Sequence, residues 1–266
     1  MKGRPMASEE GWTSLRLNSR QEDLVERLRR DRVMSVTALA DALQVSTETI
    51  RRDVRTLAAK GILVKQHGNV LWPESRDDEP LQRRMAANMG AKRRIAQAIA
   101  REIKDGESLL IDSGSTTLYV AEGLRGHRNL TTVTISAPVA QMLAPGDGNR
   151  VFLAGGEVRA DDCAAYGPAC LSYLAQFTAE TAILSAAAIS REFGVMDHHM
   201  CEVEVCRILV ERAERVIVAA DASKFAAKGL IAACPLAEID LLVTDAAPPA
   251  ELAQALEAAD VELMVA

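Results

Sequence analysis

Apolar residues near the N-terminus recur at helical spacing in three short segments, and a fourth segment alternates. The helical segments are residues 20–31, 36–43 and 47–60, and residues 62–72 read as two short strands around a turn that contains glycine. Ser35 and Ser46 stand at helix N-cap positions, and Gly61 stands just past the third helix. The residues expected to share a core are Leu24, Val25, Leu28, Leu39, Leu43, Ile50, Val54 and Leu57. Three helices and a hairpin predict a winged helix-turn-helix domain over residues 19–73.

A different pattern follows a charged, proline-bounded linker, which we place at residues 74–89. From Gly90 onward, a helical segment is followed by apolar strand-like segments that alternate with helical ones. The strand-like segments are residues 108–112, 129–135, 150–155, 181–185, 215–221, 240–245 and 261–266. Such alternation is typical of α/β folds, in which helices cover both faces of a parallel sheet. The sequence therefore predicts a Rossmann-like domain over residues 90–266, and a disordered tail over residues 1–18.

Composition and charge divide the chain in the same place. The 266 residues are 48% apolar, which suits two folded domains, and the net charge is −6. Residues 16–72 hold 11 Lys and Arg against 7 Asp and Glu, a balance of +4, so the remainder carries −10. A basic small module joined to an acidic large one indicates a nucleic-acid reader with a second task.

The cysteines and the hydropathy predict a cytoplasmic protein. The five cysteines are odd in number and form no C-x-x-C pair, which favours free thiols in a reducing compartment. They are Cys163, Cys170, Cys201, Cys206 and Cys234. No apolar run approaches a membrane span, and no signal peptide opens the chain.

The third predicted helix carries basic and hydroxyl side chains on the side opposite its apolar residues. Arginine suits guanine edges and phosphates, because its planar fork makes two parallel hydrogen bonds, and the first half of a second helix is the part that enters a major groove. The residues expected to contact DNA there are Ser46, Thr47, Thr49, Arg51, Arg52 and Arg55, with Lys65 and His67 from the hairpin. The alternative is an ordinary solvated arginine face. The capped turn and the hairpin favour DNA.

The sequence Ile111–Thr117, IDSGSTT, places a polar loop between a predicted strand and a predicted helix. Backbone N–H groups at a helix N-terminus attract anions, and a glycine lets the ligand approach closely. A simple capped turn is an equally good interpretation of the loop alone. Among phosphate sites, a P-loop is excluded because its Lys is missing. An ATP loop of the sugar-kinase or actin type and a phosphosugar pocket of the ribose-phosphate-isomerase type stay open, although about 175 residues are few for the kinase fold.

Two longer motifs give the chain a family resemblance. Residues 36–70, VTALADALQVSTETIRRDVRTLAAKGILVKQHGNV, resemble the DNA-binding module of the DeoR-type bacterial transcription regulators. From Ala91 onward, IDSGSTT, Thr134 with Ser136, Gly155-Gly156 with Arg159, Glu202 and the DASK motif at 221–224 resemble the effector domain of that family. The resemblance implies a ribose-phosphate-isomerase-like effector domain with a pocket for a phosphorylated metabolite.

The resemblance also implies roles for individual residues. Ser113 to Thr117 would hold phosphate, Arg159 and Lys224 would add positive charge, and Asp112 and Glu202 would read hydroxyl groups. The full set of implied effector residues is Asp112, Ser113, Gly114, Ser115, Thr116, Thr117, Ser136, Gly155, Gly156, Arg159, Glu202 and Lys224.

The sequence departs from the family pattern in three places. HGN-V replaces the usual HGG-A in the hairpin, Ile135 stands where Asn is common, and Ser185 to Ile189, SAAAI, replaces GADGI. The last two are expected to reshape the pocket. Residues 244–263, TDAAPPAELAQALEAADVEL, are similar to the glycerol-3-phosphate repressor branch, which makes glycerol 3-phosphate one candidate effector.

Catalysis and metal binding find little support in the residues. Isomerisation needs a base and groups that polarise a carbonyl, and the SAAAI stretch offers no acid. The sequence MDHHMCE at 196–202 holds metal-ligand types, but adjacent histidines diverge, and the usual ligand spacings are missing. We therefore predict no catalytic residue, no metal and no cofactor.

The predicted protein is a repressor of a sugar or polyol catabolic operon. It is expected to bind operator DNA as a dimer or tetramer, away from any membrane, with an affinity controlled by a phosphorylated sugar or polyol. The competing hypothesis is a phosphosugar-converting, isomerase-like enzyme with a DNA-binding appendage.

Overall fold

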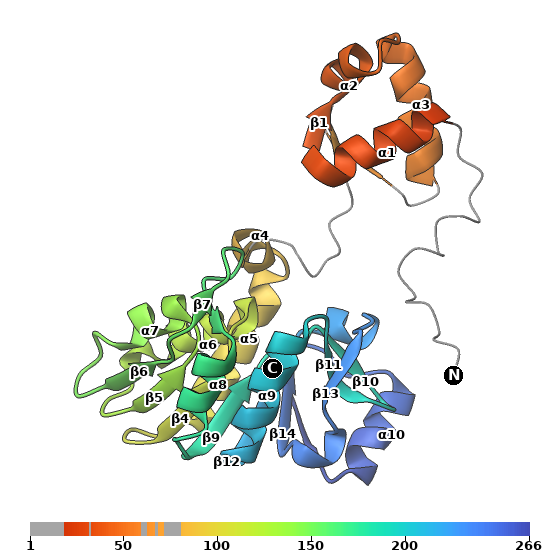
Figure 1. Ribbon diagram of the computed structural model, residues 1–266. Helices are drawn as coiled ribbons and strands as arrows, with labels where there is room; N and C mark the ends of the chain where they lie inside the picture. Colours follow the sequence, from red (N-terminus) through yellow and green to blue (C-terminus); the bar gives the residue numbers. More distant parts are fainter. Residues whose placement is uncertain (1–18, 32, 60–62, 67–68, 72–80) are drawn as a thin grey trace, which may run out of the picture. The chain divides into compact units, whose positions relative to one another are not determined.

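The computed structural model describes residues 19–31, 33–59, 63–66, 69–71 and 81–266. The chain forms two compact units, residues 1–78 and 79–266, and each is described by itself. Figure 1 shows the helices of the first unit and the larger α/β unit that follows. The predicted tail at residues 1–18, His67 and most of the predicted linker before Leu81 lie outside the described residues.

The N-terminal unit has the predicted three helices, which are α1 (Ser19–Asp31), α2 (Val36–Ala42) and α3 (Thr47–Ala59). Strand β1 (Val33–Ser35) pairs with the hairpin strand β3 (Asn69–Leu71), which also pairs with β2 (Val64–Gln66), in an antiparallel sheet of order β1-β3-β2. Strand β1 was not predicted, because three residues between two helices give too short an alternation to detect.

The predicted apolar positions form the core of this unit. Leu24, Leu28, Leu39, Ile50 and Leu57 have no exposed surface, and Leu43 is half-buried against the same cluster. Both predicted N-caps are confirmed. The Ser35 Oγ accepts a hydrogen bond from the Ala38 N–H at 3.0 Å, and the Ser46 Oγ accepts one from the Thr49 N–H at 3.2 Å.

The Ser46 cap gives a first prediction. Ser46→Ala should lower the free energy of unfolding of the N-terminal unit by about 1 kcal/mol, because the cap satisfies an N–H that the helix cannot. Urea denaturation of the full chain, followed by a probe in this unit, measures the effect. Ser46→Asp retains the acceptor and should keep most of the stability. Equal stability of the alanine and aspartate variants would contradict the capping role.

The C-terminal unit is built on a seven-stranded, fully parallel sheet of order β15-β14-β12-β9-β4-β5-β6. Its strands are β4 (Ser108–Ile111), β5 (Thr131–Thr134), β6 (Arg150–Leu153), β9 (Ala179–Leu184), β12 (Ala213–Ala219), β14 (Leu241–Thr244) and β15 (Glu262–Val265). All seven coincide with strands predicted from the sequence. A parallel sheet of this kind is buried on both faces, which explains its continuous apolar runs.

Helices cover both faces of this sheet (Figure 1). One face packs against α5 (Met89–Glu102), α6 (Ser115–Gly123) and α7 (Ala137–Leu143). The other face packs against α8 (Pro168–Leu174), α9 (Met200–Glu211) and α10 (Ala250–Ala258). Short 3-10 helices η2 (Leu124–Gly126), η3 (Ala222–Phe225) and η4 (Leu236–Glu238) complete the connections.

Several elements were not predicted from the sequence. Helix α4 (Leu81–Ala86) lies inside the range predicted as linker, so the C-terminal unit begins before Gly90. Helix α7 was also missed. The remaining strands are β7 (Glu157–Val158) with β8 (Ala165–Tyr166), and an antiparallel sheet of β10 (Ala188–Ser190), β11 (Gly194–Asp197) and β13 (Ile231–Cys234).

Within the described part of the chain, no helix is both long and apolar enough to cross a membrane.

Candidate effector site and DNA-binding face

Three arginines of α3 point away from the core of the N-terminal unit. The side chains of Arg51, Arg52 and Arg55 are exposed, while Ile50 and Val54 on the other side are buried. Arg51 lies 3.5 Å from Glu48, a partner one turn earlier. Within the described residues, Arg52 and Arg55 have no ion-pair partner, so their charge is available to phosphate or to base edges.

The hydroxyl residues at the start of α3 have a local role. The Ser46 hydroxyl caps the helix by accepting from the Thr49 N–H, and the hydroxyl groups of Ser46 and Thr49 lie 2.8 Å apart. Thr47 is half-buried, and Lys65 of β2 is exposed. The contact of these residues with DNA stays a prediction.

The sequence reasoning missed Asp53, which supports this helix from its buried side. Its carboxylate is 5% exposed and accepts hydrogen bonds from Arg20 Nε at 2.6 Å and Gln21 Nε2 at 3.1 Å. A carboxylate can be buried only when it is paired, and these contacts tie α3 to α1. The signal was present in the sequence, because an Asp on the apolar side of an amphipathic helix needs a partner.

The IDSGSTT loop lies where the strand order of the large sheet reverses. From β4 the chain moves outward to β5 and then β6, whereas β9 lies on the other side of β4 and continues to β12. The carboxyl ends of β4 and β9 therefore border a topological switch point, the usual ligand position in open parallel α/β sheets. Asp112 and Ser113 follow β4 there, and Ser185 follows β9.

Helix α6 begins at this point with the predicted anion loop. Ser115, Thr116 and Thr117 are buried in the first turn, where N–H groups lack helical partners. The Thr117 Oγ1 donates to the Gly114 carbonyl at 3.1 Å, so its hydroxyl is engaged within the loop. In the described part of the chain, no hydrogen bond uses the hydroxyl of Ser115 or Thr116. Those two hydroxyl groups are the ones available to an anion.

Asp112 faces the loop from the end of β4. Its carboxylate accepts from the Ser113 N–H at 2.6 Å and from the Ser185 N–H at 3.4 Å. The Ser185 Oγ lies 3.3 Å from both the Asp112 Oδ2 and the Ser113 carbonyl. Burial raises the pKa of Asp112 to about 7, and the Glu202 charge adds to the rise, against the hydrogen bonds from Ser113 and Ser185.

The pKa of Asp112 predicts how stability changes with pH. Between about pH 4 and 7 the folded state keeps a proton that the unfolded state has lost, so this residue lowers stability as pH rises through that range. Each unit of difference between the folded and unfolded pKa corresponds to about 1.4 kcal/mol of stability. Asp112→Asn should therefore become more stable relative to the wild type from pH 5 to pH 8. Urea midpoints at a series of pH values test this, and a constant difference would contradict it.

Arg159 lies at the centre of a group of acidic residues. Its guanidinium forms ion pairs with Asp161 at 2.8 Å, with Asp162 at 2.6 Å and, in a close contact, with Glu202. It also donates to the Tyr166 Oη at 3.0 Å and lies over the Tyr166 ring. Its positive charge is therefore balanced by three carboxylates. To meet a phosphate as the resemblance implies, Arg159 would have to exchange one of these partners.

Asp162 organises this group, and the sequence reasoning missed it. It is 1% exposed and accepts from Arg159, from the Tyr166 Oη at 2.8 Å, from the Ala164 N–H at 3.2 Å and from the Ser113 Oγ at 3.3 Å. The hydrogen bonds from Arg159 and Tyr166 lower the pKa of Asp162 despite its burial. Asp162 thus connects the anion loop to the β7–β8 segment.

Asp197 and Glu202 bring two further carboxyl groups to the site. Burial is the main cause that raises the pKa of Asp197 to about 9. A hydrogen bond to Glu202 and the charges of Glu202 and Asp112 add to the rise. Asp197 ends β11 and belongs to the MDHHMCE segment at residues 196–202, which leads into α9. Within the described residues, no group of three or more His, Cys, Asp or Glu side chains is arranged to hold a metal ion.

The other predicted effector residues occupy varied positions at the same sheet edge. The Ser136 Oγ caps α7 at 3.5 Å from the Val139 N–H, so it has a structural partner. A Cβ at Gly156 would lie 2.4 Å from the Tyr166 carbonyl oxygen, which explains that glycine by close packing, whereas Gly155 is exposed and unobstructed. Lys224 is half-buried in η3, after β12. Their contact with an effector stays a prediction.

A helix-turn-helix unit with an open arginine face, joined in one chain to an α/β unit with a polar anion loop, defines a ligand-responsive, DNA-binding transcriptional regulator. Residues 20–76 match the DeoR-like helix-turn-helix domain, and residues 87–246 match the DeoR C terminal sensor domain. The chain belongs to the DeoR family of transcriptional regulators.

Two similar proteins are named as transcriptional repressors. The chain is 31% identical to the glycerol-3-phosphate regulon repressor of Escherichia coli (strain K12), over 91% of this chain and 96% of that one. It is 32% identical to the putative aga operon transcriptional repressor of Escherichia coli O157:H7, over 93% of both. These names support a regulator rather than an enzyme, and they give no support to the phosphosugar-converting alternative.

Ribose 5-phosphate isomerase from Plasmodium falciparum is a distant structural neighbour. It is 13% identical, covers 50% of this chain and 51% of its own, and has a TM-score of 0.36. This likeness is too low to carry an argument about the site.

Proposed function

We propose that the protein represses an operon for sugar or polyol catabolism, and that a phosphorylated metabolite bound at the anion loop controls its affinity for operator DNA. The observation that carries this proposal is the position of the loop. It opens helix α6 at the switch point of the sheet, with the Ser115 and Thr116 hydroxyls uncommitted.

The acidic surroundings of the loop narrow the class of effector. Asp112, Asp162, Asp197 and Glu202 are carboxyl groups, and the nearby Arg159 is shared among three carboxylates. Carboxyl groups accept hydrogen bonds from hydroxyls, and those that are ionised repel a second anionic group. The effector is therefore a monophosphate whose remaining groups are hydroxyls. Glycerol 3-phosphate is the simplest such molecule, and it appears in the name of one relative.

A thermal-shift comparison of two closely related ligands tests the effector class. Glycerol 3-phosphate should stabilise the protein by about 2.7 kcal/mol at a hundred times its dissociation constant. The molecule 3-phosphoglycerate, which carries a carboxylate in place of the terminal hydroxymethyl group, should stabilise it far less. Glycerol without phosphate is the second control. Equal stabilisation by both phosphates would contradict the role of the acidic groups, and none by any phosphorylated polyol would overturn the proposal.

The oligomer follows from the way helix-turn-helix proteins read DNA. A dimer or tetramer acting on cytoplasmic DNA would place two recognition helices on half-sites about 10 base pairs apart, or a multiple of that distance. Analytical ultracentrifugation of the full chain, with footprinting on a selected duplex, measures both quantities. A monomer that protects one half-site would contradict this part of the proposal.

A further inference from the structure

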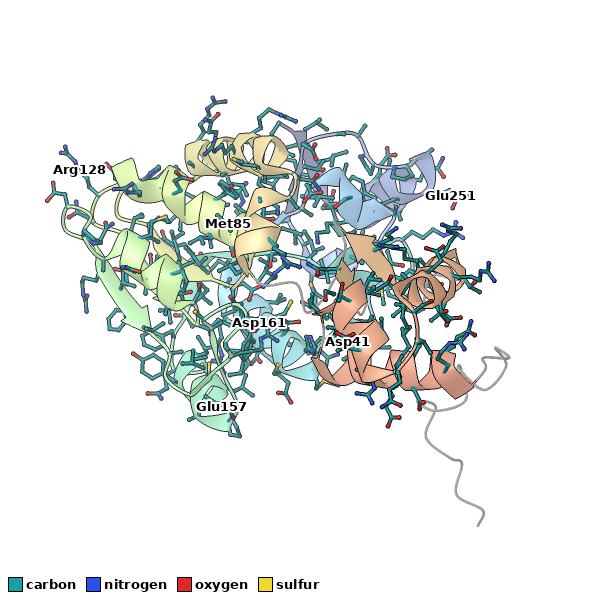
Figure 2. All side chains as sticks on the ribbon, turned by 90° about the horizontal axis from the view of Figure 1, so that it is seen from above. Asp41, Met85, Arg128, Glu157, Asp161 and Glu251 are labelled. Carbon is teal, nitrogen blue, oxygen red and sulfur yellow. The ribbon has the colours of Figure 1, made fainter. Side chains whose placement is uncertain are left out.

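Helix α4 is attached at its start to the segment that carries Arg159. The Leu81 N–H, at the first residue of α4, donates to the Asp161 carbonyl at 2.9 Å. Asp161 is an ion-pair partner of Arg159, and its neighbour Asp162 accepts from the Ser113 Oγ in the anion loop. Figure 2 labels Asp161 in the segment between β7 and β8, and Met85 on α4. The start of α4 is thus one hydrogen bond away from the acidic group around Arg159.

The end of α4 is attached to the helix that follows the anion loop. The Tyr119 Oη donates to the Met85 carbonyl at 3.0 Å, and the Lys92 Nζ donates to the Arg84 carbonyl at 2.5 Å. These are two of the last-turn carbonyls, which have no partner within the helix. Tyr119 lies on α6, two residues after Thr117. A displacement of the start of α6 would therefore act directly on the end of α4.

Asn88, which lies between α4 and α5, is attached to the DASK motif at residues 221–224, another of the predicted effector segments. The Asn88 Nδ2 donates to the Asp221 Oδ1 at 2.8 Å, and Asp221 caps η3, which contains Lys224. Asn88 has a φ of 52°, in the left-handed region, so the direction of the chain between α4 and α5 depends on this residue. The side chains of Leu81 and Met85 pack on the same apolar cluster as α5 and α6.

We infer that α4 with its exit residue Asn88 is the coupling element that carries effector occupancy toward the DNA-binding unit. It is the first element of the C-terminal unit after the helix-turn-helix unit along the chain, and its attachments reach all three segments named above. The inference rests on the proposed function, because it assumes an effector at the loop. A physical coupling element must have an arrangement that both sites bias, and these hydrogen bonds supply the effector side.

A double variant separates coupling from binding. Asn88→Gly keeps the left-handed backbone but removes the amide, and Tyr119→Phe removes one hydroxyl from a buried ring. The matched control is Asn129→Gly with Tyr173→Phe, because Asn129 has a φ of 58° and Tyr173 is a half-buried ring on α8. All measurements use the full chain and a duplex selected by the wild type from a random-sequence pool.

The first readout is the factor by which glycerol 3-phosphate changes affinity for that duplex. Such factors are typically about 5 to 150. The double variant should bind the ligand and the duplex separately within about threefold of the wild type, yet its coupling factor should fall below about two. The control should keep the wild-type factor. A double variant with the wild-type factor would overturn the inference.

The second readout needs no effector and therefore separates the two proposals. Because coupling is reciprocal, adding the duplex alone to the wild type should change amide hydrogen exchange at residues 81–88 and at residues 112–119. In the double variant the change at 112–119 should be lost. Its persistence there, or no change in the wild type, would overturn the coupling role of α4. If the exchange change at 112–119 is lost in the double variant and glycerol 3-phosphate does not alter duplex affinity in the wild type, the coupling role of α4 stands and that effector is rejected.

Discussion

Replacing Arg52 by alanine is expected to weaken binding to a specific operator by roughly 1–3 kcal/mol, about 5-fold to 150-fold. The side chain is exposed on the first half of α3, and the described residues offer it no acidic partner. Arg51 is the weaker test, because Glu48 lies 3.5 Å from its guanidinium. Fluorescence anisotropy with a selected duplex, at several salt concentrations, measures the effect.

Two companion variants sharpen this prediction. Arg52→Lys keeps the charge but loses the planar fork, so it should retain the salt dependence while discriminating less between sequences. Arg27→Ala removes an arginine from α1 in the same unit and is the control for net charge. If Arg52→Ala binds the selected duplex as tightly as Arg27→Ala does, Arg52 is not a contact residue.

The N-terminal unit could be predicted closely because its signals are local. Ile50, Val54 and Leu57 recur at one spacing, and the caps at Ser35 and Ser46 mark the helix starts. The seven parallel strands were equally accessible, since each is an apolar run between helical segments. In both cases the information that selects the element lies within a few residues of it.

The missed elements depend on contacts that the sequence does not display. Helix α4 has only Leu81 and Met85 to bury, among charged neighbours, and its ends are satisfied by Asp161, Lys92 and Tyr119 from elsewhere. A helix of six residues is not stable alone, so its existence depends on those partners.

The candidate site also contains residues that local sequence predicts and residues that only the fold brings together. The loop at Ser113 to Thr117 could be predicted from its local sequence, because the strand, the glycine and the hydroxyl residues are adjacent in the chain. Asp162 was not found, although it contacts Ser113 across 49 residues of chain. The acidic partners of Arg159 could not be predicted from the sequence pattern either. Only the fold brings Glu202, 43 residues away, to its guanidinium.

The loop itself gives the second large prediction, which concerns Gly114. A Cβ there would lie 2.4 Å from the Ser185 Oγ and 2.9 Å from the Ser185 Cβ, so even alanine must displace the loop or β9's end. The reason is close approach, because the φ of 174° is open to any residue. Gly114→Ala should therefore abolish the effector response while leaving operator binding without effector unchanged.

Ser185 provides the matched test of that explanation. Ser185→Gly removes the side chain that Gly114→Ala would meet, so the double variant should regain the effector response that Gly114→Ala loses. Ser185→Gly alone should keep the response, because the Asp112 carboxylate still accepts from the Ser113 N–H at 2.6 Å. Release of a selected duplex on titration with glycerol 3-phosphate is the measurement, and calorimetric binding of the same ligand separates lost binding from lost coupling. Normal release by Gly114→Ala would place the pocket elsewhere. Failure of the double variant to recover, with Ser185→Gly active, would mean that the added methyl group blocks the anion itself rather than moving the loop.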